Sequence, residues 1–251
     1  MRELFPEVAS DVDPAARYAG DDRRAARAGR PWVLVNMITT VDGATAVEGR
    51  SGGLGGSADK RVFAAVRAVA DVVLVGAGTV RAERYHAPRR RPDGSAPRLA
   101  IVTRSLDLDL DGPVFTADPA NRPLVVTSED ADPARREDVA AVADVVVAGR
   151  ELVDVDAALG AIAATGARVV VCEGGPSLNG HLVLADALDE VCLSVSPLAA
   201  GGRSPRVAQG ETPAVLRRLR LDRVLEEDGY LFLRYVRDDG SVSGASGPST
   251  S

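Results

Sequence analysis

Two glycine-containing turns follow short apolar runs and contain residue types that suit the binding of a phosphate group. The first is Gly-Ala-Gly-Thr at residues 76–79, directly after the apolar run 72–75. The second is Gly-Gly-Pro-Ser at residues 174–177, which follows the apolar run 169–172 and Glu173. Glycine lets a ligand approach the backbone closely, and free amides at the start of a helix attract phosphate. Both turns are therefore candidate binding sites.

Neither turn matches a common nucleotide-binding motif. Arg81 stands where the third glycine of a dinucleotide fingerprint would be, and no Lys-Ser or Lys-Thr pair follows to complete a P-loop. A single glycine turn of this kind is equally well explained as a tight turn that binds nothing. Two such turns on the same sheet are a stronger indication of a ligand-binding site.

A third polar turn, Thr103-Arg104-Ser105, follows the apolar run 99–102. Ligands of parallel sheets bind at the carboxyl ends of the strands, so the three turns are expected at one edge. Arg104 is suited to a ribose 2′-phosphate, and the alternative interpretation is a solvated loop cation.

The segment 36–46 leaves the first apolar run and leads into a glycine-rich stretch, residues 49–56. Such a density of glycine beside a site is consistent with a mobile lid. A plain surface loop would explain the glycines but not the neighbouring Thr39, Thr40 and Asp42.

Metal chemistry and nucleophilic catalysis are not indicated. The two histidines, His86 and His181, and the two cysteines, Cys172 and Cys192, are not paired at the spacing of a zinc site. No nucleophile-elbow motif is present. Both cysteines lie in apolar runs and are expected to be core residues, which suits a reducing compartment.

The elements that must position these residues alternate along the chain. Runs of Val and Leu that are apolar on both faces are typical of central, mostly parallel strands, and helical patterns separate several of them. The alternation predicts an α/β fold, and Asp228-Gly229 predicts an antiparallel hairpin at the end. The expected strands are residues 32–35, 72–75, 99–102, 124–126, 145–147, 169–172, 191–195, 219–227 and 230–236, and the expected helices are 58–69 (capped by Ser57), 133–142, 155–164 and 178–188.

Composition divides the chain into three parts. Residues 1–30 are rich in Arg and Asp and are interpreted as a polar leader, with one short helix expected over 14–28. Residues 31–237 form the expected domain, and the Gly, Ser and Pro content of residues 238–251 predicts a disordered tail.

The bulk composition excludes several classes of function. The formal net charge of −6, with cations scattered among anions, argues against a nucleic-acid-binding surface. No apolar run approaches the roughly 20 residues needed to cross a bilayer, and residues 1–30 lack the apolar core of a signal peptide. A cytoplasmic protein with no membrane partner is expected.

From residue 31 to residue 236 the sequence resembles the pyrimidine reductase family of riboflavin biosynthesis. The order and separation of several short motifs carry this resemblance, although each motif alone is not specific. The motifs are residues 40–43, Arg67, residues 70–80, 83–85, 173–178, 188–190 and 196–198.

The resemblance implies a three-layer αβα fold like that of dihydrofolate reductase, NADPH as cofactor, and a homodimer. The apolar segments 191–198 and 219–236 are candidates for its interface. The resemblance also implies a stand-alone reductase without the zinc deaminase domain of bifunctional members. It implies substrate contacts from Asn36, Ser51, Arg67 and Glu173. The cofactor contacts that it implies are Gly76, Gly78, Thr79, Thr103, Arg104, Ser105, Gly174, Gly175, Pro176, Ser177, Leu178 and Asn179.

The resulting hypothesis is hydride transfer from NADPH to C1 of a ribosylaminopyrimidine, mainly by positioning donor against acceptor. Glu173 would orient the substrate, and Glu83 or Asp42 would lie near the transferred proton.

The chain departs from the family at Asn36, usually Lys, and at Glu83, usually Asp, and the basic residues 89–91 are candidates for a substitute phosphate contact. Two alternatives therefore stay open: reduction of a pterin such as dihydrofolate, and a non-catalytic NADPH-binding sensor.

Overall fold

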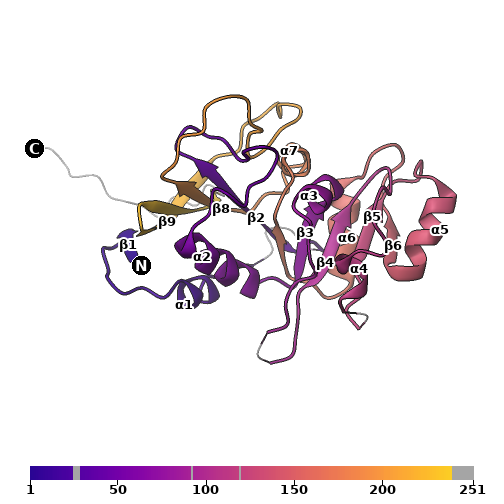
Figure 1. Ribbon diagram of the computed structural model, residues 1–251, viewed down its shortest axis with the longest axis horizontal. Coiled ribbons are helices and arrows are strands. Elements are labelled where there is room, and N and C mark those ends of the chain that lie inside the picture. Colours follow the sequence, from indigo (N-terminus) through magenta and orange to yellow (C-terminus); the bar gives the residue numbers. More distant parts are fainter. Residues whose placement is uncertain (25–28, 92, 119, 239–251) are drawn as a thin grey trace, which may run out of the picture.

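The computed structural model describes residues 1–24, 29–91, 93–118 and 120–238, and one sheet runs through this part of the chain (Figure 1). The sheet has ten strands in the order β1-β9-β10-β8-β2-β7-β3-β4-β5-β6. Figure 1 shows β1 and β9 at one end of the molecule and β6, with α5, at the other. The strands are β1 (Arg2–Phe5), β2 (Trp32–Thr40), β3 (Val72–Gly76), β4 (Arg98–Val102), β5 (Leu124–Thr127), β6 (Asp144–Val147), β7 (Val169–Cys172), β8 (Glu190–Ser196), β9 (Leu219–Glu227) and β10 (Tyr230–Arg237).

The sheet is parallel from β8 through β2 to β6 and antiparallel from β8 through β10 and β9 to β1. This confirms the expected α/β fold with a mostly parallel sheet and an antiparallel C-terminal hairpin. The helices are α1 (Pro14–Ala19), α2 (Ser57–Ala68), α3 (Ala77–Ala82), α4 (Pro113–Thr116), α5 (Pro133–Val142), α6 (Val155–Ala164) and α7 (Pro176–Leu184).

Two apolar cores lie on opposite faces of the sheet, because successive side chains of a strand point to opposite sides. In β3, Val73 and Val75 pack into one core with α2 and α5, while Val72 and Leu74 pack into the other with α6 and α7. Strands buried on both faces explain the continuous apolar runs in the sequence. The result is three layers, with helices on both sides.

The sequence patterns predicted the bounds of most helices to within a few residues. Helices α5 and α6 have the predicted bounds. Gly56 rather than Ser57 is the N-cap of α2, and it makes no side-chain cap, so the predicted cap is wrong. Helix α7 begins at Pro176, which needs no amide partner in a first turn, and ends at Leu184 rather than at residue 188.

Strand β2 is longer than predicted, because residues 34–40 pair with β8 in a parallel register. Asn36, Thr39 and Thr40 therefore belong to a buried strand and not to an exit loop. The partner strand lies more than 150 residues away in the sequence, so no local pattern indicates this extension.

Residues 1–24 pack on the same sheet. Strand β1 pairs with β9, and Tyr18 of α1 is fully buried. The expected helix over 14–28 ends at Ala19 in the structure, and residues 25–28 lie outside the described part. The predicted disordered tail also lies outside it from residue 239 onward. Within the described ranges, no helix is both long and apolar enough to cross a membrane.

A buried ionic network attaches this N-terminal segment to the sheet. Glu190 of β8, with its side chain fully buried, accepts hydrogen bonds from Arg23 (3.0 Å), Arg234 (2.7 Å) and the Trp32 indole (2.9 Å). Burial alone would raise the pKa of Glu190, but the charges of Arg23 and Arg234 hold it below its ordinary value. The carboxylate is therefore charged in the folded protein.

We expect Glu190→Gln to lower the free energy of unfolding by about 3 kcal/mol at neutral pH, because it leaves two buried guanidinium groups undercompensated. Since the folded-state pKa of Glu190 is depressed, the difference from wild type should shrink as pH falls through the acidic range in which glutamate titrates. Chemical denaturation measures both effects. The matched control is Asp138→Asn, which breaks an exposed pair with Arg135 and should cost less than about 0.5 kcal/mol. Equal losses in the two variants would contradict a stabilising role for the network.

Candidate active site

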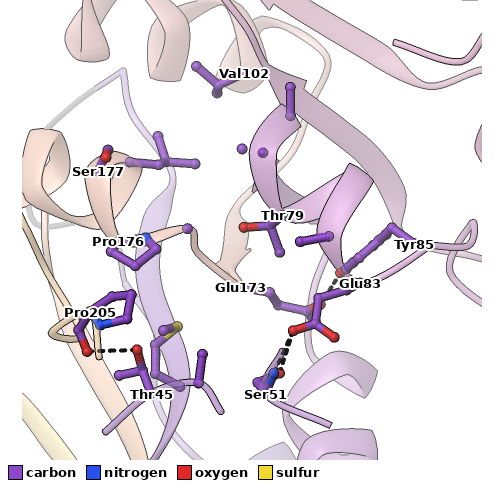
Figure 2. A pocket seen from close by; sticks show the side chains of 18 of the residues that line it. Thr45, Ser51, Thr79, Glu83, Tyr85, Val102, Glu173, Pro176, Ser177 and Pro205 are labelled. Carbon is purple, nitrogen blue, oxygen red and sulfur yellow. Dashed lines mark hydrogen bonds between the residues drawn. The ribbon is translucent and has the colours of Figure 1, made fainter. Parts of the chain in front are cut away.

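A cavity of about 750 Å³ lies at the carboxyl ends of β3, β4 and β7, where the sequence placed the three polar turns. In Figure 2, Val102 and Ser177 lie at one end of it, Glu83, Glu173 and Ser51 lie at the other, and Thr79 lies between them. Of the predicted site residues, those that line it are Asn36, Ser51, Gly76, Gly78, Thr79, Glu83, Thr103, Arg104, Ser105, Glu173, Gly175, Pro176, Ser177 and Leu178.

The two glycine turns touch each other. The Gly76 amide donates to the Gly174 carbonyl at 2.8 Å, and a Cβ on Gly175 would lie 2.8 Å from Thr79 Oγ1. Gly174 has a φ of +89°, and its peptide bond to Gly175 is cis. A side chain at Gly174 or Gly175 would therefore be strained or would separate the turns. Gly78 has open space around its Cβ direction, so the wall is accessible there.

The third turn is fixed by Thr103. Its amide donates to the Val126 carbonyl at 3.0 Å, and its hydroxyl accepts from the Leu106 amide at 3.0 Å. Thr103 is buried, whereas Arg104 and Ser105 are exposed on the cavity wall. No hydrogen bond or ion pair joins Arg104 to another residue of the described chain. Arg104 is thus a cation available to a ligand.

Glu173 is held in place by Arg67 and Tyr85. Arg67 of α2 makes two hydrogen bonds of 2.6 Å to the two carboxylate oxygens, and it donates to the Tyr85 hydroxyl at 2.6 Å. The Tyr85 hydroxyl in turn donates to Glu173. The guanidinium also stacks on the ring of Phe63, 4.5 Å from its centroid.

The electrostatics of this group follow from its burial. The Glu173 side chain is 4% exposed and that of Arg67 is 25% exposed. Burial works to lower the pKa of Arg67, but the hydrogen bonds and charge of Glu173 raise it above its ordinary value. Burial and the Glu173 charge raise the pKa of Tyr85. Arg67 is therefore a permanent cation whose charge is already compensated, and Tyr85 is a neutral donor.

Glu83 fastens the glycine-rich stretch over the cavity. Its Oε1 accepts from the Ser51 amide at 2.7 Å and from the Ser51 hydroxyl at 3.0 Å. Figure 2 shows both side chains on the same side of the cavity as Glu173. The lid expected over residues 49–56 stays a prediction, but its attachment point to the site is Glu83.

Four predicted site residues do not line the cavity: Asp42, Arg67, Gly174 and Asn179. Arg67 and Gly174 act through their contacts with Glu173 and Gly76. The buried Asn179 donates to the Val207 carbonyl at 2.7 Å and so supports the loop beside α7.

Asp42 is bound by the chain itself. It accepts from Thr40 and from the amides of Ala200 (3.2 Å) and Gly201 (2.7 Å), and the Thr40 hydrogen bond and those amides lower its pKa to about 2. A carboxylate this acidic, outside the cavity, has a turn-stabilising role, so we do not assign it to proton transfer.

The sequence did not single out Asp59 or Ser194, which both line the cavity. Asp59 lies in the first turn of α2, where an acidic residue is ordinarily explained by the helix dipole. Burial raises its pKa, and a hydrogen bond with Ser194 of β8 opposes the rise. The pairing of β8 with β2 brings Ser194 to this wall, and no local signal predicts it.

The basic segment at residues 89–91 does not line the cavity. Arg90 pairs with Asp118, and Arg91 donates to the Ala70 carbonyl. The charges of Arg90 and Arg91 are therefore engaged outside the cavity. Both cysteines are buried and free, and burial raises the pKa of Cys172 to about 12, which fits the core role expected of them.

Known proteins resemble the chain over the domain that holds this cavity. A reductase for 2,5-diamino-6-ribosylamino-4(3H)-pyrimidinone 5′-phosphate from Archaeoglobus fulgidus is 30% identical over 207 residues, covering 78% of this chain and 93% of the relative. The enzyme of the same name from Methanothermobacter thermautotrophicus is 31% identical over 181 residues, covering 70% and 82%.

Solved structures share the fold. A pyrimidine reductase-like protein from Corynebacterium diphtheriae superposes with a TM-score of 0.74 at 26% identity, covering 82% of this chain and 92% of the other. The riboflavin biosynthesis reductase of Saccharomyces cerevisiae superposes with a TM-score of 0.67 at 18% identity, covering 87% and 94%, and it supports the fold alone. The family model of the RibD C-terminal domain matches residues 31–229, and the chain belongs to that family.

Proposed function

We propose that this chain uses NADPH to reduce a ribosylaminopyrimidine, opening the sugar to a ribitylamino product. The observation that carries the proposal is one cavity with a glycine-lined half and a carboxylate-bearing half that meet at Glu173 and Gly175. The names of the relatives, which are pyrimidine reductases, support the same reaction class.

The cofactor half fits a dinucleotide. Gly78 leaves the wall open, and Ser177 and Leu178 lie in the first turn of α7, where amides lack partners within the helix. Arg104 offers an uncompensated guanidinium for a ribose 2′-phosphate, which would favour NADPH over NADH. NADPH, when bound, supplies the hydride.

The substrate half positions the acceptor. Glu173 accepts two hydrogen bonds from Arg67 and one from Tyr85, which fix the orientation of its carboxylate. This carboxylate can accept hydrogen bonds from N–H and O–H groups of the substrate. Ser51 and Glu83 join the glycine-rich stretch to this half and so would exclude water when substrate is present. Few acid-base groups are required, because the rate gain comes from holding the hydride donor and the acceptor carbon in reacting geometry.

We also propose a homodimer formed through one face of β8 and β10. Val191, Leu193 and Val195 alternate with buried residues, and Leu231 and Leu233 pair directly with Val195 and Leu193. These apolar side chains are only half buried, and an antiparallel sheet with such a face is suited to self-association.

We expect Glu173→Gln to lower kcat/KM on the order of 10²-fold while the Kd for NADPH stays within twofold, since the amide cannot keep both guanidinium contacts or accept as strongly. Loss of NADPH absorbance and fluorescence titration measure the two quantities. The matched control is Glu137→Gln on the exposed side of α5. Wild-type turnover by Glu173→Gln would remove Glu173 from the mechanism.

Arg104→Ala should weaken NADPH binding about 10-fold and leave NADH binding unchanged, because only NADPH carries the 2′-phosphate. Titration of both nucleotides measures this, and Arg168→Ala, an exposed cation just before the start of β7, serves as the control. An equal loss for both nucleotides would argue that Arg104 does not contact that phosphate.

The dimer should sediment at twice the 26.1 kDa mass of one chain at micromolar concentration. Leu233→Asp should shift it toward the monomer, because a charge on this face opposes apolar association. A wild-type protein that sediments as a monomer would contradict the dimer.

A further inference from the structure

Asp59 is a cavity-lining carboxylate to which the proposed reaction gives no role. It lies in the first turn of α2, is half-buried, and shares a hydrogen bond with the Ser194 hydroxyl of β8. A side chain at Gly55 would collide with its Oδ2, so the glycine-rich stretch also packs against it. Burial raises the pKa of Asp59, and the Ser194 hydrogen bond and the charge of Lys60 oppose the rise. Hydrogen bonds donated by a ligand would compensate this desolvated carboxylate.

The other two carboxylates on the cavity wall are already engaged. Glu173 accepts hydrogen bonds from Arg67 and Tyr85, and Glu83 accepts from the amide and the hydroxyl of Ser51. Asp59 forms no ion pair within the described parts of the chain. A carboxylate has about four acceptor positions, so Asp59 keeps the capacity to bind donors of a ligand in the cavity.

Asp59 and Glu173 come from separate ends of the substrate half. Ser194, the partner of Asp59, belongs to β8, whereas Glu173 directly follows β7, and β2 lies between these two strands. Two strand spacings amount to about 10 Å. Arg67, which binds Glu173, lies eight residues along α2 from Asp59, a rise of about 12 Å. The sheet and the helix therefore agree on a separation of about 10 Å between the two carboxylates.

A single pyrimidine ring can contact both carboxylates. The nitrogens of amino groups at C2 and C5 of one ring are about 5.5 Å apart, and a hydrogen bond of about 2.9 Å at each end extends this reach to about 11 Å. The C2–N3 edge is opposite to the C5–C6 edge, and C6 carries the ribosylamino group. When the reacting C1 of the sugar lies at Glu173, beside the nicotinamide, the C2–N3 edge therefore faces Asp59.

The C2 substituent determines which hydrogen bonds that edge can make. A 2-amino-4(3H)-pyrimidinone presents two adjacent donors, the amino group and N3–H, which match the two oxygens of a carboxylate. A uracil presents N3–H beside the C2 carbonyl, whose oxygen a carboxylate repels. The names of the relatives specify the 2-amino form as the substrate of those proteins.

We propose that Asp59 determines the substrate specificity of the cavity by accepting hydrogen bonds from the C2 amino group and N3–H, so that a 2-aminopyrimidinone is preferred over the corresponding uracil. The inference rests on the proposed reductase function and specifies the pyrimidine that this site takes. Both forms carry the same ribose 5′-phosphate, so contacts with the phosphate do not distinguish them.

The direct test offers the full chain, with NADPH, either 2,5-diamino-6-ribosylamino-4(3H)-pyrimidinone 5′-phosphate or 5-amino-6-ribosylaminouracil 5′-phosphate. We expect kcat/KM to be at least about 10-fold higher for the 2-amino form, because the uracil leaves a carboxylate oxygen against a carbonyl oxygen. Equal values, or a preference for the uracil, would overturn the inference while leaving the reductase function intact.

A binding measurement tests the inference without turnover. Calorimetry on the protein saturated with NADP⁺ gives the Kd of the ribitylamino product in its 2-amino and its uracil form. Binding of the 2-amino form that is tighter by about 10-fold supports the inference. Equal binding, tighter binding of the uracil form, or binding of neither overturns it. If the 2-amino preference is retained but neither substrate is reduced, the proposed reaction is wrong and the specificity stands.

Asp59→Asn tests the residue itself. The amide presents one acceptor and one donor, which match N3–H and the C2 carbonyl of the uracil. We therefore expect kcat/KM to fall about 10-fold for the 2-amino form and not to fall for the uracil form, with the NADPH Kd changed less than about twofold. A purely structural role would lower both values together.

The control is Asp156→Asn, which removes an exposed carboxylate from the first turn of α6 and so reproduces the change in helix dipole. It should keep the wild-type ratio of the two kcat/KM values. Thermal unfolding of both variants monitors folding. An unchanged ratio in folded Asp59→Asn would overturn the role of Asp59.

Discussion

The ion pair between Arg67 and Glu173 joins three parts of the molecule at the cavity. It links α2 to the end of β7, and through the Tyr85 hydroxyl it holds the segment that follows α3. Removing two charges from water is costly unless they are paired and their remaining hydrogen bonds are satisfied. The bidentate geometry and the Tyr85 contact meet that requirement. The same contacts compensate both charges, so the pair fixes the shape of the site and is itself neutral.

The sheet determines where this pair can act. Parallel strands β3, β4 and β7 end at one edge, so the backbone turns that follow them form a single wall. The turns after β3 and β7 approach closely enough for Gly76 to bond Gly174, which requires the absence of side chains there. Glu173 lies directly before this contact. A phosphate-bearing cofactor along the glycine turns and a substrate at the carboxylates would therefore meet at one point.

The helices and strands that could be predicted are those whose sequence pattern lies within the element itself. Helices α5 and α6 have the bounds that their local helical patterns predicted, and in the structure Asp132 and Asp154 cap their starts. The continuation of β2 to Thr40 could not be predicted in this way, because it depends on pairing with β8. The attachment of residues 1–24 likewise depends on distant partners such as Glu190.

The parts of the site formed by backbone turns beside a strand could be predicted from the sequence. The parts formed by side chains from elements far apart in the sequence could not. The glycine turns and Arg104 were identified from residue types beside buried strands. Asp42 lies in a matching motif and Asn179 directly follows one, yet the structure has both bonded to the chain and away from the cavity lining. Asp59 was missed because an acidic residue in a first helical turn has an ordinary explanation. Its burial became visible only when β8 and residues 49–56 were in place.

The most direct test of the account is a crystal structure of the chain with NADP⁺ bound. We expect the 2′-phosphate at Arg104, the pyrophosphate against Gly78 and the first turn of α7, and the nicotinamide beside Glu173. A nicotinamide bound at the Arg104 end, or a cofactor bound outside this cavity, would contradict it.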